Sequence, residues 1–211
     1  MKPMEDDLQR PLKQSLALMQ RRIVEESTYF GIRTMKSPTD FWVYQEILHR
    51  HRPDVVIEIG NLRGGSALAI AHLLDHLGAG RVIAIDIDQS SIAPAARAHP
   101  RIEFIESDAA SAATQVSRKL GTAEKVMVIE DSSHAYEQTL AVLEAYGPMV
   151  TKGQYLVVED SICHHGVDQG PAPGPYEAIA TFVASHPEFR ADRSREAFGI
   201  TWNPMGYLLR S

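Results

Sequence analysis

The chain has 211 residues, of which 44% are hydrophobic and 23% charged, and a net charge of −6 at pH 7. Such a composition excludes a disordered protein and predicts one compact domain, or two at most. The acidic balance argues against nucleic-acid binding, which needs a basic face.

Two further observations bear on the cellular environment. No apolar run approaches the roughly 20 residues of a membrane-spanning helix, so we expect no membrane contact. The N-terminal segment Met1–Arg22 lacks the apolar stretch of a secretory signal, and the single cysteine, Cys163, cannot form an internal disulfide. A cytoplasmic protein is therefore predicted.

Residues 1–53 precede the first predicted strand and are expected to be mostly helical, over Gln9–Ser27 and Thr39–Arg52. A Ser-Pro-Thr-Asp sequence that begins at Ser37 is typical of a helix start. We expect this segment to form a helical cap over a ligand crevice in the domain formed by residues 54–211. The alternative is a plain packing helix.

Short runs rich in Val and Ile recur after residue 53, separated by stretches with helical spacing. Because the runs are nearly continuous rather than alternating, they indicate strands covered on both faces. Strand–helix repeats predict an α/β fold with a Rossmann-like, doubly wound, mostly parallel sheet and helices on both faces. The predicted strands are Asp54–Gly60, Arg81–Asp86, Ile102–Glu106, Lys125–Glu130 and Gln154–Glu159, and the helices between them Gly65–Leu77, Ile92–Ala98, Ala109–Leu120 and Tyr136–Tyr146.

The segment His164–Pro175 is rich in Gly and Pro and has no periodicity. A loop at the carboxyl edge of a sheet is where binding residues tend to lie, although a simple linker is the alternative. Beyond it we expect a helix near Tyr176–Ser185 and one or two edge strands, the last near Tyr207–Arg210.

The first predicted strand runs into an E-x-G-x-x-x-G-G-S motif that extends from Glu58 to Ser66. A dinucleotide fingerprint would instead read G-x-G-x-x-G, and the acid would repel a pyrophosphate. The motif suits a ligand with a cationic group, such as the sulfonium and amino groups of S-adenosylmethionine. A generic strand-to-helix turn is the alternative.

Acidic residues also end the next two strands. Asp86 lies where nucleoside-binding α/β folds place a ribose-binding acid, and Ser107 and Asp108 follow the third strand, where they would contact an adenine edge. Each acid alone could be a solvated strand end, but their succession favours a cofactor pocket. The predicted cofactor-binding residues are Glu58, Gly60, Asn61, Gly64, Ser66, Asp86, Ile87, Ser107 and Asp108.

Further acids follow strands four and five, whose ends should be neighbours at one edge of the sheet. Like charges in a cleft raise each other's pKa, and a divalent cation such as Mg²⁺ relieves this conflict with carboxylate ligands. We predict Asp131, Glu159 and Asp160 as metal ligands, while Glu130 should point to the other face of its strand. The alternative is that these acids and their neighbouring serines cap helices.

His134 lies three residues after Asp131 and is expected to face the same crevice. A neutral imidazole there can accept a proton from a hydroxyl, so His134 and Asp131 are the predicted catalytic residues. The alternatives are that His134 is a metal ligand or that it is a solvated loop histidine. His164 and His165 lack the partner spacing of a zinc site.

The motif from Glu58 to Ser66 is followed along the chain by VIAIDID, which contains Asp86, by D-S-S-H, which begins at Asp131, and by LVVED, which ends at Asp160. In this order the four motifs resemble those of class I S-adenosylmethionine-dependent methyltransferases. More narrowly it is similar to the cephalosporin hydroxylase / rhamnosyl O-methyltransferase family. The segments KSPTDFWVYQ, GPAPGPYEAI and NPMGYLLR extend the resemblance over roughly residues 28–210.

This resemblance implies methyl transfer from S-adenosylmethionine to a hydroxyl of a small secondary metabolite or sugar, with divalent metal assistance in many members. By similarity to the catechol type, Asp131, Glu159 and Asp160 fall on metal-ligand positions, and His134 falls where that type carries a general base. Related enzymes often self-associate, so a homo-oligomer is expected. A nicotinamide-dependent oxidoreductase, disfavoured by the motif at Glu58, and a non-catalytic cofactor-binding member are the alternatives.

Overall fold

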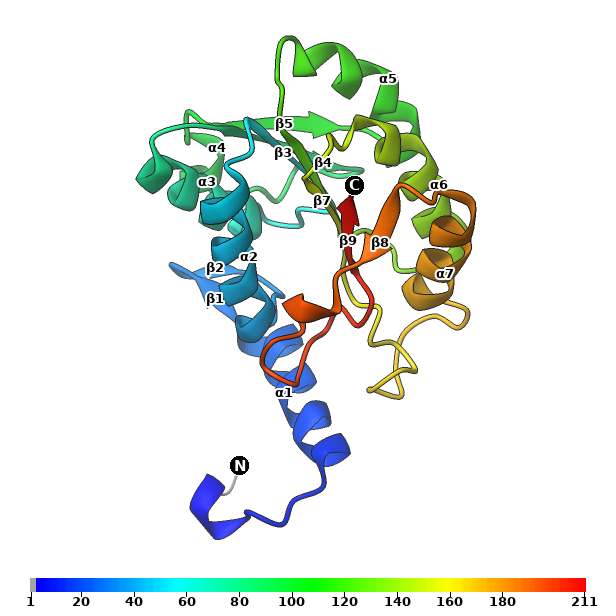
Figure 1. The fold of residues 1–211 in the computed structure, drawn as a ribbon. Coiled ribbons are helices and arrows are strands. Elements are labelled where there is room, and N and C mark those ends of the chain that lie inside the picture. The colour runs from blue at the N-terminus through cyan, green and yellow to red at the C-terminus, as the bar shows by residue number, and fades with distance from the viewer. Residues whose placement is uncertain (1–2) are drawn as a thin grey trace.

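The computed structural model describes residues 3–211, which form a seven-stranded sheet with helices on both faces (Figure 1). The strand order is β5-β4-β3-β6-β7-β9-β8, and the first five of these strands are parallel. The predicted α/β fold with a mostly parallel sheet is thus confirmed. Its strands are β3 (Val55–Ile59), β4 (Arg81–Asp86), β5 (Ile102–Glu106), β6 (Val126–Glu130), β7 (Tyr155–Val158), β8 (Phe189–Ala191) and β9 (Tyr207–Arg210).

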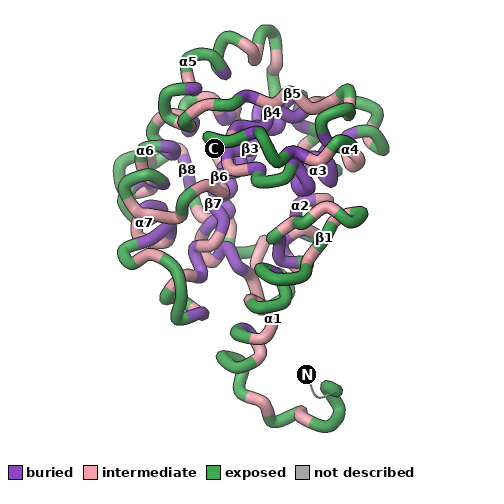
Figure 2. The backbone as a smooth tube through the Cα atoms, turned by 180° about the vertical axis from the view of Figure 1, so that it is seen from behind, coloured by how far each residue is buried: buried purple, intermediate pink, exposed green. Residues whose placement is uncertain are grey.

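Helices cover the two faces in two groups: α2 (Pro38–His51) and α3 (Gly65–Leu77) on one, and α5 (Ala109–Leu120), α6 (Tyr136–Tyr146) and α7 (Pro175–Ser185) on the other. Within β3, Ile57 packs toward the second group and Val56 toward the first. Because both faces are covered by apolar side chains, the central strands β3, β4, β6 and β7 are nearly continuous in apolar residues. Figure 2 shows these strands as the buried centre of the molecule.

The helix predicted over Ile92–Ala98 is a single turn, α4 (Pro94–Arg97). Pro94 fits the first turn of a helix, and Pro100 disfavours helical backbone at the residue before it. The two prolines therefore leave room for one turn only.

The N-terminal segment differs from the expectation of mostly helix. Between α1 (Leu12–Glu26) and α2 lies a small hairpin of β1 (Thr28–Tyr29) and β2 (Ile32–Arg33). Its two turn residues, Phe30 and Gly31, both have positive φ, as tight hairpin turns require.

The remaining N-terminal elements are helical. A short 3-10 turn, η1 (Met4–Asp6), precedes α1, which lies at one end of the molecule (Figure 1). Helix α2 starts as predicted, with the Ser37 side chain accepting a hydrogen bond from the Asp40 amide. It packs against the sheet through Val43 and Ile47.

The sheet topology places a crevice at the end of β3. From β3 the chain continues to β4 and β5 on one side and then crosses to β6 and β7 on the other. Ligands of open α/β sheets bind at such a switch point, outside the carboxyl ends of the strands. The Asp131 amide after β6 donates to the Ile59 carbonyl at 2.8 Å, so the segments that follow β3 and β6 are adjacent.

None of the helices within residues 3–211 combines the length and the apolar character that crossing a membrane requires.

Candidate active site

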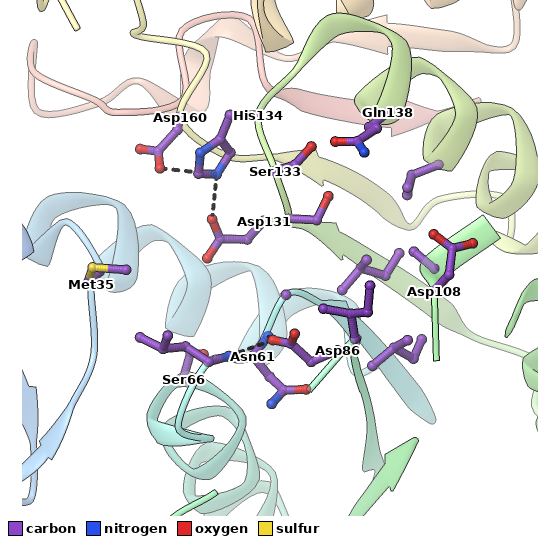
Figure 3. Close-up of a pocket in the computed structure, with 18 of the residues that line it drawn as sticks. Met35, Asn61, Ser66, Asp86, Asp108, Asp131, Ser133, His134, Gln138 and Asp160 are labelled. Atoms are coloured by element: carbon purple, nitrogen blue, oxygen red, sulfur yellow. Dashed lines mark hydrogen bonds and ion pairs between the residues drawn. The ribbon is translucent and has the colours of Figure 1, made fainter. Parts of the chain in front are cut away.

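A cavity of about 450 Å³ lies at this switch point (Figure 3). Its walls are the segment Arg33–Lys36, the turn after β3, the segments that follow β4, β5 and β6, part of α6, and Asp160 after β7. A volume of this size is typical of small-molecule sites.

The turn after β3 folds tightly because of Gly60. Its φ is +85°, and a Cβ at this position would lie 1.9 Å from the Asp131 carbonyl oxygen. Asp86 holds the turn through Oδ2, which accepts hydrogen bonds from the amides of Asn61 at 3.0 Å and Leu62 at 2.9 Å. The N-terminus of α3, with Ser66, then opens into the cavity and offers free N–H groups.

Most of the predicted cofactor-binding residues border this cavity, and two do not. Glu58 is 0% exposed because strand alternation directs it beneath the cavity, toward the α2–α3 face. Gly64 packs against the α4 region, where an added Cβ would lie 2.9 Å from the Ala96 Cβ. Those that line the cavity are Gly60, Asn61, Ser66, Asp86, Ile87, Ser107 and Asp108.

Three side chains meet at the other end of the cavity. The His134 Nε2 atom lies 3.1 Å from Asp131 Oδ1 and 3.3 Å from Asp160 Oδ2 (Figure 3). One ligand atom from each residue lies within 4.8 Å of the other two, close enough to share a metal ion. We call Asp131, His134 and Asp160 the ligand triad.

The backbone of the triad is unusual. His134 and Asp160 have φ values of +60° and +54°, a left-handed conformation that non-glycine residues seldom adopt. The helix-cap alternative does not account for Asp131, because the N-cap of α6 is Ala135 and no side chain caps that helix.

The loop His164–Pro175, expected to carry binding residues, contributes none of the cavity's lining among residues 3–211.

Glu159, which the sequence analysis predicts as a metal ligand, does not belong to the ligand triad and contacts other side chains. Along β7, Tyr155 and Val157 face the side of α2, and Glu159 continues this alternation. Its Oε1 atom accepts hydrogen bonds from the Tyr44 hydroxyl at 2.7 Å and from Lys36 Nζ at 2.5 Å. In this structure His134, rather than Glu159, completes the group around Asp131 and Asp160.

Lys36, which the sequence analysis did not single out, is the main addition to the site. Its side chain is 8% exposed, and its ammonium contacts both Asp131 and Glu159. Burial lowers the pKa of Lys36, but these carboxylates and Glu58 raise it above its usual value, so the ammonium remains charged. The only local signal was a lysine just before the helix start at Ser37.

The site as a whole has an excess of buried carboxylates. Burial raises the pKa of Glu58 to about 7 and that of Glu130 to about 8. The Glu130 Oε2 atom lacks a hydrogen-bond partner within residues 3–211. Burial lowers the pKa of His134, but Asp131 and Asp160 outweigh it and raise this pKa to about 9. A donor set so rich in carboxylate oxygens fits a hard divalent cation.

Comparisons with known proteins identify the family of this chain. A family model described as "Rhamnosyl O-methyltransferase/CmcI" matches residues 21–211. The chain is 41% identical over 191 residues to the rhamnosyl O-methyltransferase of Mycobacterium leprae, covering 87% of this chain and 83% of that protein. It is 39% identical over 193 residues to that of Mycobacterium bovis, covering 88% and 79%.

A solved structure described as "cmcI-D160 Mg-SAM" has the same fold, with a TM-score of 0.69, 21% identity, and coverage of 88% of this chain and 76% of that one. The family resemblance seen in the sequence motifs is thus confirmed. With a family match over residues 21–211 and relatives at 39–41% identity, this chain belongs to the rhamnosyl O-methyltransferase/CmcI family.

Proposed function

We propose that this protein transfers the methyl group of S-adenosylmethionine to a hydroxyl of a small-molecule acceptor with the help of a divalent cation, Mg²⁺. One observation carries the proposal: the glycine turn at Gly60 and the ligand triad border the same cavity. A methyl donor and a hydroxyl held by the triad would therefore lie close together. The names of the relatives favour a sugar hydroxyl as the acceptor.

The cofactor would occupy the part of the cavity that follows β3, β4 and β5. The α3 N-terminus and Ser66 suit the carboxylate of the methionine moiety, Asp86 suits the ribose hydroxyls, and Ser107 and Asp108 suit the adenine. The solved structure described with "Mg-SAM", which shares this fold, supports S-adenosylmethionine as the cofactor. The family disfavours a nicotinamide cofactor.

The triad would hold the cation through Asp131 and Asp160, with His134 as a third ligand or as the general base. The bound cation would supply positive charge that acidifies the acceptor hydroxyl and lowers the pKa of His134. As a base, the His134 imidazole would then take the hydroxyl proton while Asp131 Oδ1 orients the ring at 3.1 Å. The arrangement suits proton removal next to the methyl donor.

We also propose that residues 1–53 act as a cap on the domain of residues 54–211, because Arg33–Lys36 forms one wall of the cavity. The expected homo-oligomer remains a proposal as well. Its support is the exposure of Phe30 (84%) and Trp42 (58%) on this same N-terminal segment.

Calorimetric titration with S-adenosylmethionine and S-adenosylhomocysteine, in Mg²⁺ and in EDTA, tests the proposal directly. Both should bind in either condition, whereas release of S-adenosylhomocysteine with an alkyl rhamnoside acceptor should require the metal. NADH serves as the control and should not bind. Failure of both methyl-donor ligands to bind under every condition would exclude the methyltransferase.

The role of His134 has its own test in the pH profile of turnover. A base must be unprotonated, so wild-type kcat should rise with pH as His134 loses its proton. The midpoint of this rise should lie below pH 9, because the bound cation would lower the pKa of His134 from its value of about 9 in the metal-free site. His134→Gln should lower kcat by roughly 100-fold or more and remove this rising limb. A variant that keeps the limb but loses Mg²⁺ affinity would identify His134 as a ligand instead.

A further inference from the structure

Lys36 connects the ligand triad to Glu159. Asp131 uses its two oxygens in different directions: Oδ1 faces His134 Nε2 at 3.1 Å, and Oδ2 contacts Lys36 Nζ. The same ammonium lies 2.5 Å from Glu159 Oε1. Asp131 is therefore shared between the triad and the lysine.

The contact is buried, so its charges are strongly coupled. The side chains of Lys36 and Glu159 are each 8% exposed, and that of Asp131 is 17% exposed. Such charges are poorly screened by solvent and ions. An ammonium on Asp131 Oδ2 and a divalent cation near Oδ1 would repel each other and draw on the same carboxylate.

Glu159 is held in place by the lysine and a tyrosine. Lys36 and the Tyr44 hydroxyl both donate to Oε1, and the strand alternation of β7 already directs the side chain toward them. Asp160, the next residue, turns into the triad through its left-handed backbone. The two adjacent acids thus contact different partners, Glu159 the Lys36 ammonium and Asp160 the His134 ring.

We propose that Lys36 is a positioning residue that competes with the divalent cation for Asp131 and Glu159 and so limits the affinity of the metal site. The ammonium offsets the charge of the acids in the metal-free protein and, together with Tyr44 and the strand alternation of β7, holds Glu159 away from the ligand triad. Because such coupling is reciprocal, a cation that weakens the Lys36 contacts must bind more tightly once Lys36 is removed. This inference rests on the metal site of the proposed function.

A double-mutant cycle on metal affinity tests the inference without using activity. Mn²⁺ is titrated calorimetrically into the wild type, Lys36→Met, Glu159→Gln and the double variant at one pH and ionic strength. Lys36→Met should bind Mn²⁺ roughly tenfold more tightly. Glu159→Gln should leave the wild-type affinity nearly unchanged but cancel most of the gain in the Lys36→Met background.

Two controls separate competition from general structural damage. Lys36→Arg keeps the positive charge and should retain the wild-type affinity. Lys13→Met removes an exposed lysine, 69% accessible and paired with Asp168 on the surface, and should also have no effect.

Equal or weaker Mn²⁺ binding by Lys36→Met would overturn the inference. If Lys36→Met does not fold, Glu159→Gln decides alone: a tenfold loss of affinity would mean that Glu159 is a ligand despite Lys36. Binding by Lys36→Met but not by the wild type would support the inference and contradict metal assistance in the native enzyme. If no protein binds Mn²⁺, both ideas are wrong, and the S-adenosylmethionine titration judges methyl transfer separately.

Discussion

Replacing Asp160 by asparagine is expected to lower kcat for methyl transfer by at least roughly 100-fold and to leave S-adenosylmethionine affinity nearly unchanged. Asp160 would supply one of the three proposed ligand atoms, and its Oδ2 lies 3.3 Å from His134 Nε2. The proposed cofactor residues after β3 and β4 lie elsewhere in the cavity. Asparagine keeps the size of the side chain and tolerates the left-handed backbone, so the fold should persist.

Asp168→Asn is the matched control for this variant. Asp168 lies only eight positions further along the chain, but its side chain is 71% exposed and pairs with Lys13 at the surface. Its removal should change neither kcat nor cofactor affinity. Full activity of Asp160→Asn in the presence of EDTA would disprove metal assistance at this site.

Gly60→Ala is expected to destabilise the protein by about 3–5 kcal/mol, or roughly 10 °C in Tm. The new Cβ would lie 1.9 Å from the Asp131 carbonyl oxygen and 2.9 Å from the Ser132 Cα. Both contacts are to backbone, so β3 and β6 must separate at the point where the cavity forms. We therefore expect cofactor binding to be lost as well, in calorimetry at a temperature where the variant remains folded.

Gly153→Ala separates the steric clash from the backbone strain. Gly153 has a φ of +79°, close to the +85° of Gly60, but no atom lies within 4 Å of its added Cβ. The free energy of unfolding of this variant should fall only by the cost of alanine in a left-handed conformation, about 1–2 kcal/mol, and the variant should bind the cofactor normally. Equal losses of Tm in the two variants would show that the close approach to Asp131 is unimportant.

The sheet was predictable because strands that are buried on both faces are rich in apolar, mostly β-branched residues. The five Val- and Ile-rich runs became β3 to β7. Four of the acids at or just after the ends of these strands line the cavity: Asp86, Asp108, Asp131 and Asp160. The hairpin at Thr28–Arg33 was missed because strands of two residues are too short to show an alternation. The turn residues Phe30 and Gly31 were its only local signal.

Within the site, the sequence predicted which residues gather and not how each side chain points. Glu159 and Asp160 look equivalent as neighbours, but strand alternation and a left-handed backbone send them to different partners. Lys36 escaped prediction for another reason. It lies 95 residues from Asp131 and 123 from Glu159, and its role exists only in the folded protein.

The left-handed backbone at His134 and Asp160 also bears on how this enzyme responds to selection. Each such residue costs on the order of 1–2 kcal/mol relative to a relaxed conformation, and Asp160 adds a carboxylate to an already crowded group. His134→Gly and Asp160→Gly would relieve that strain while removing side chains of the proposed metal site. A screen for heat resistance alone would therefore reward inactive enzymes, and engineering of this scaffold must select for turnover in every round.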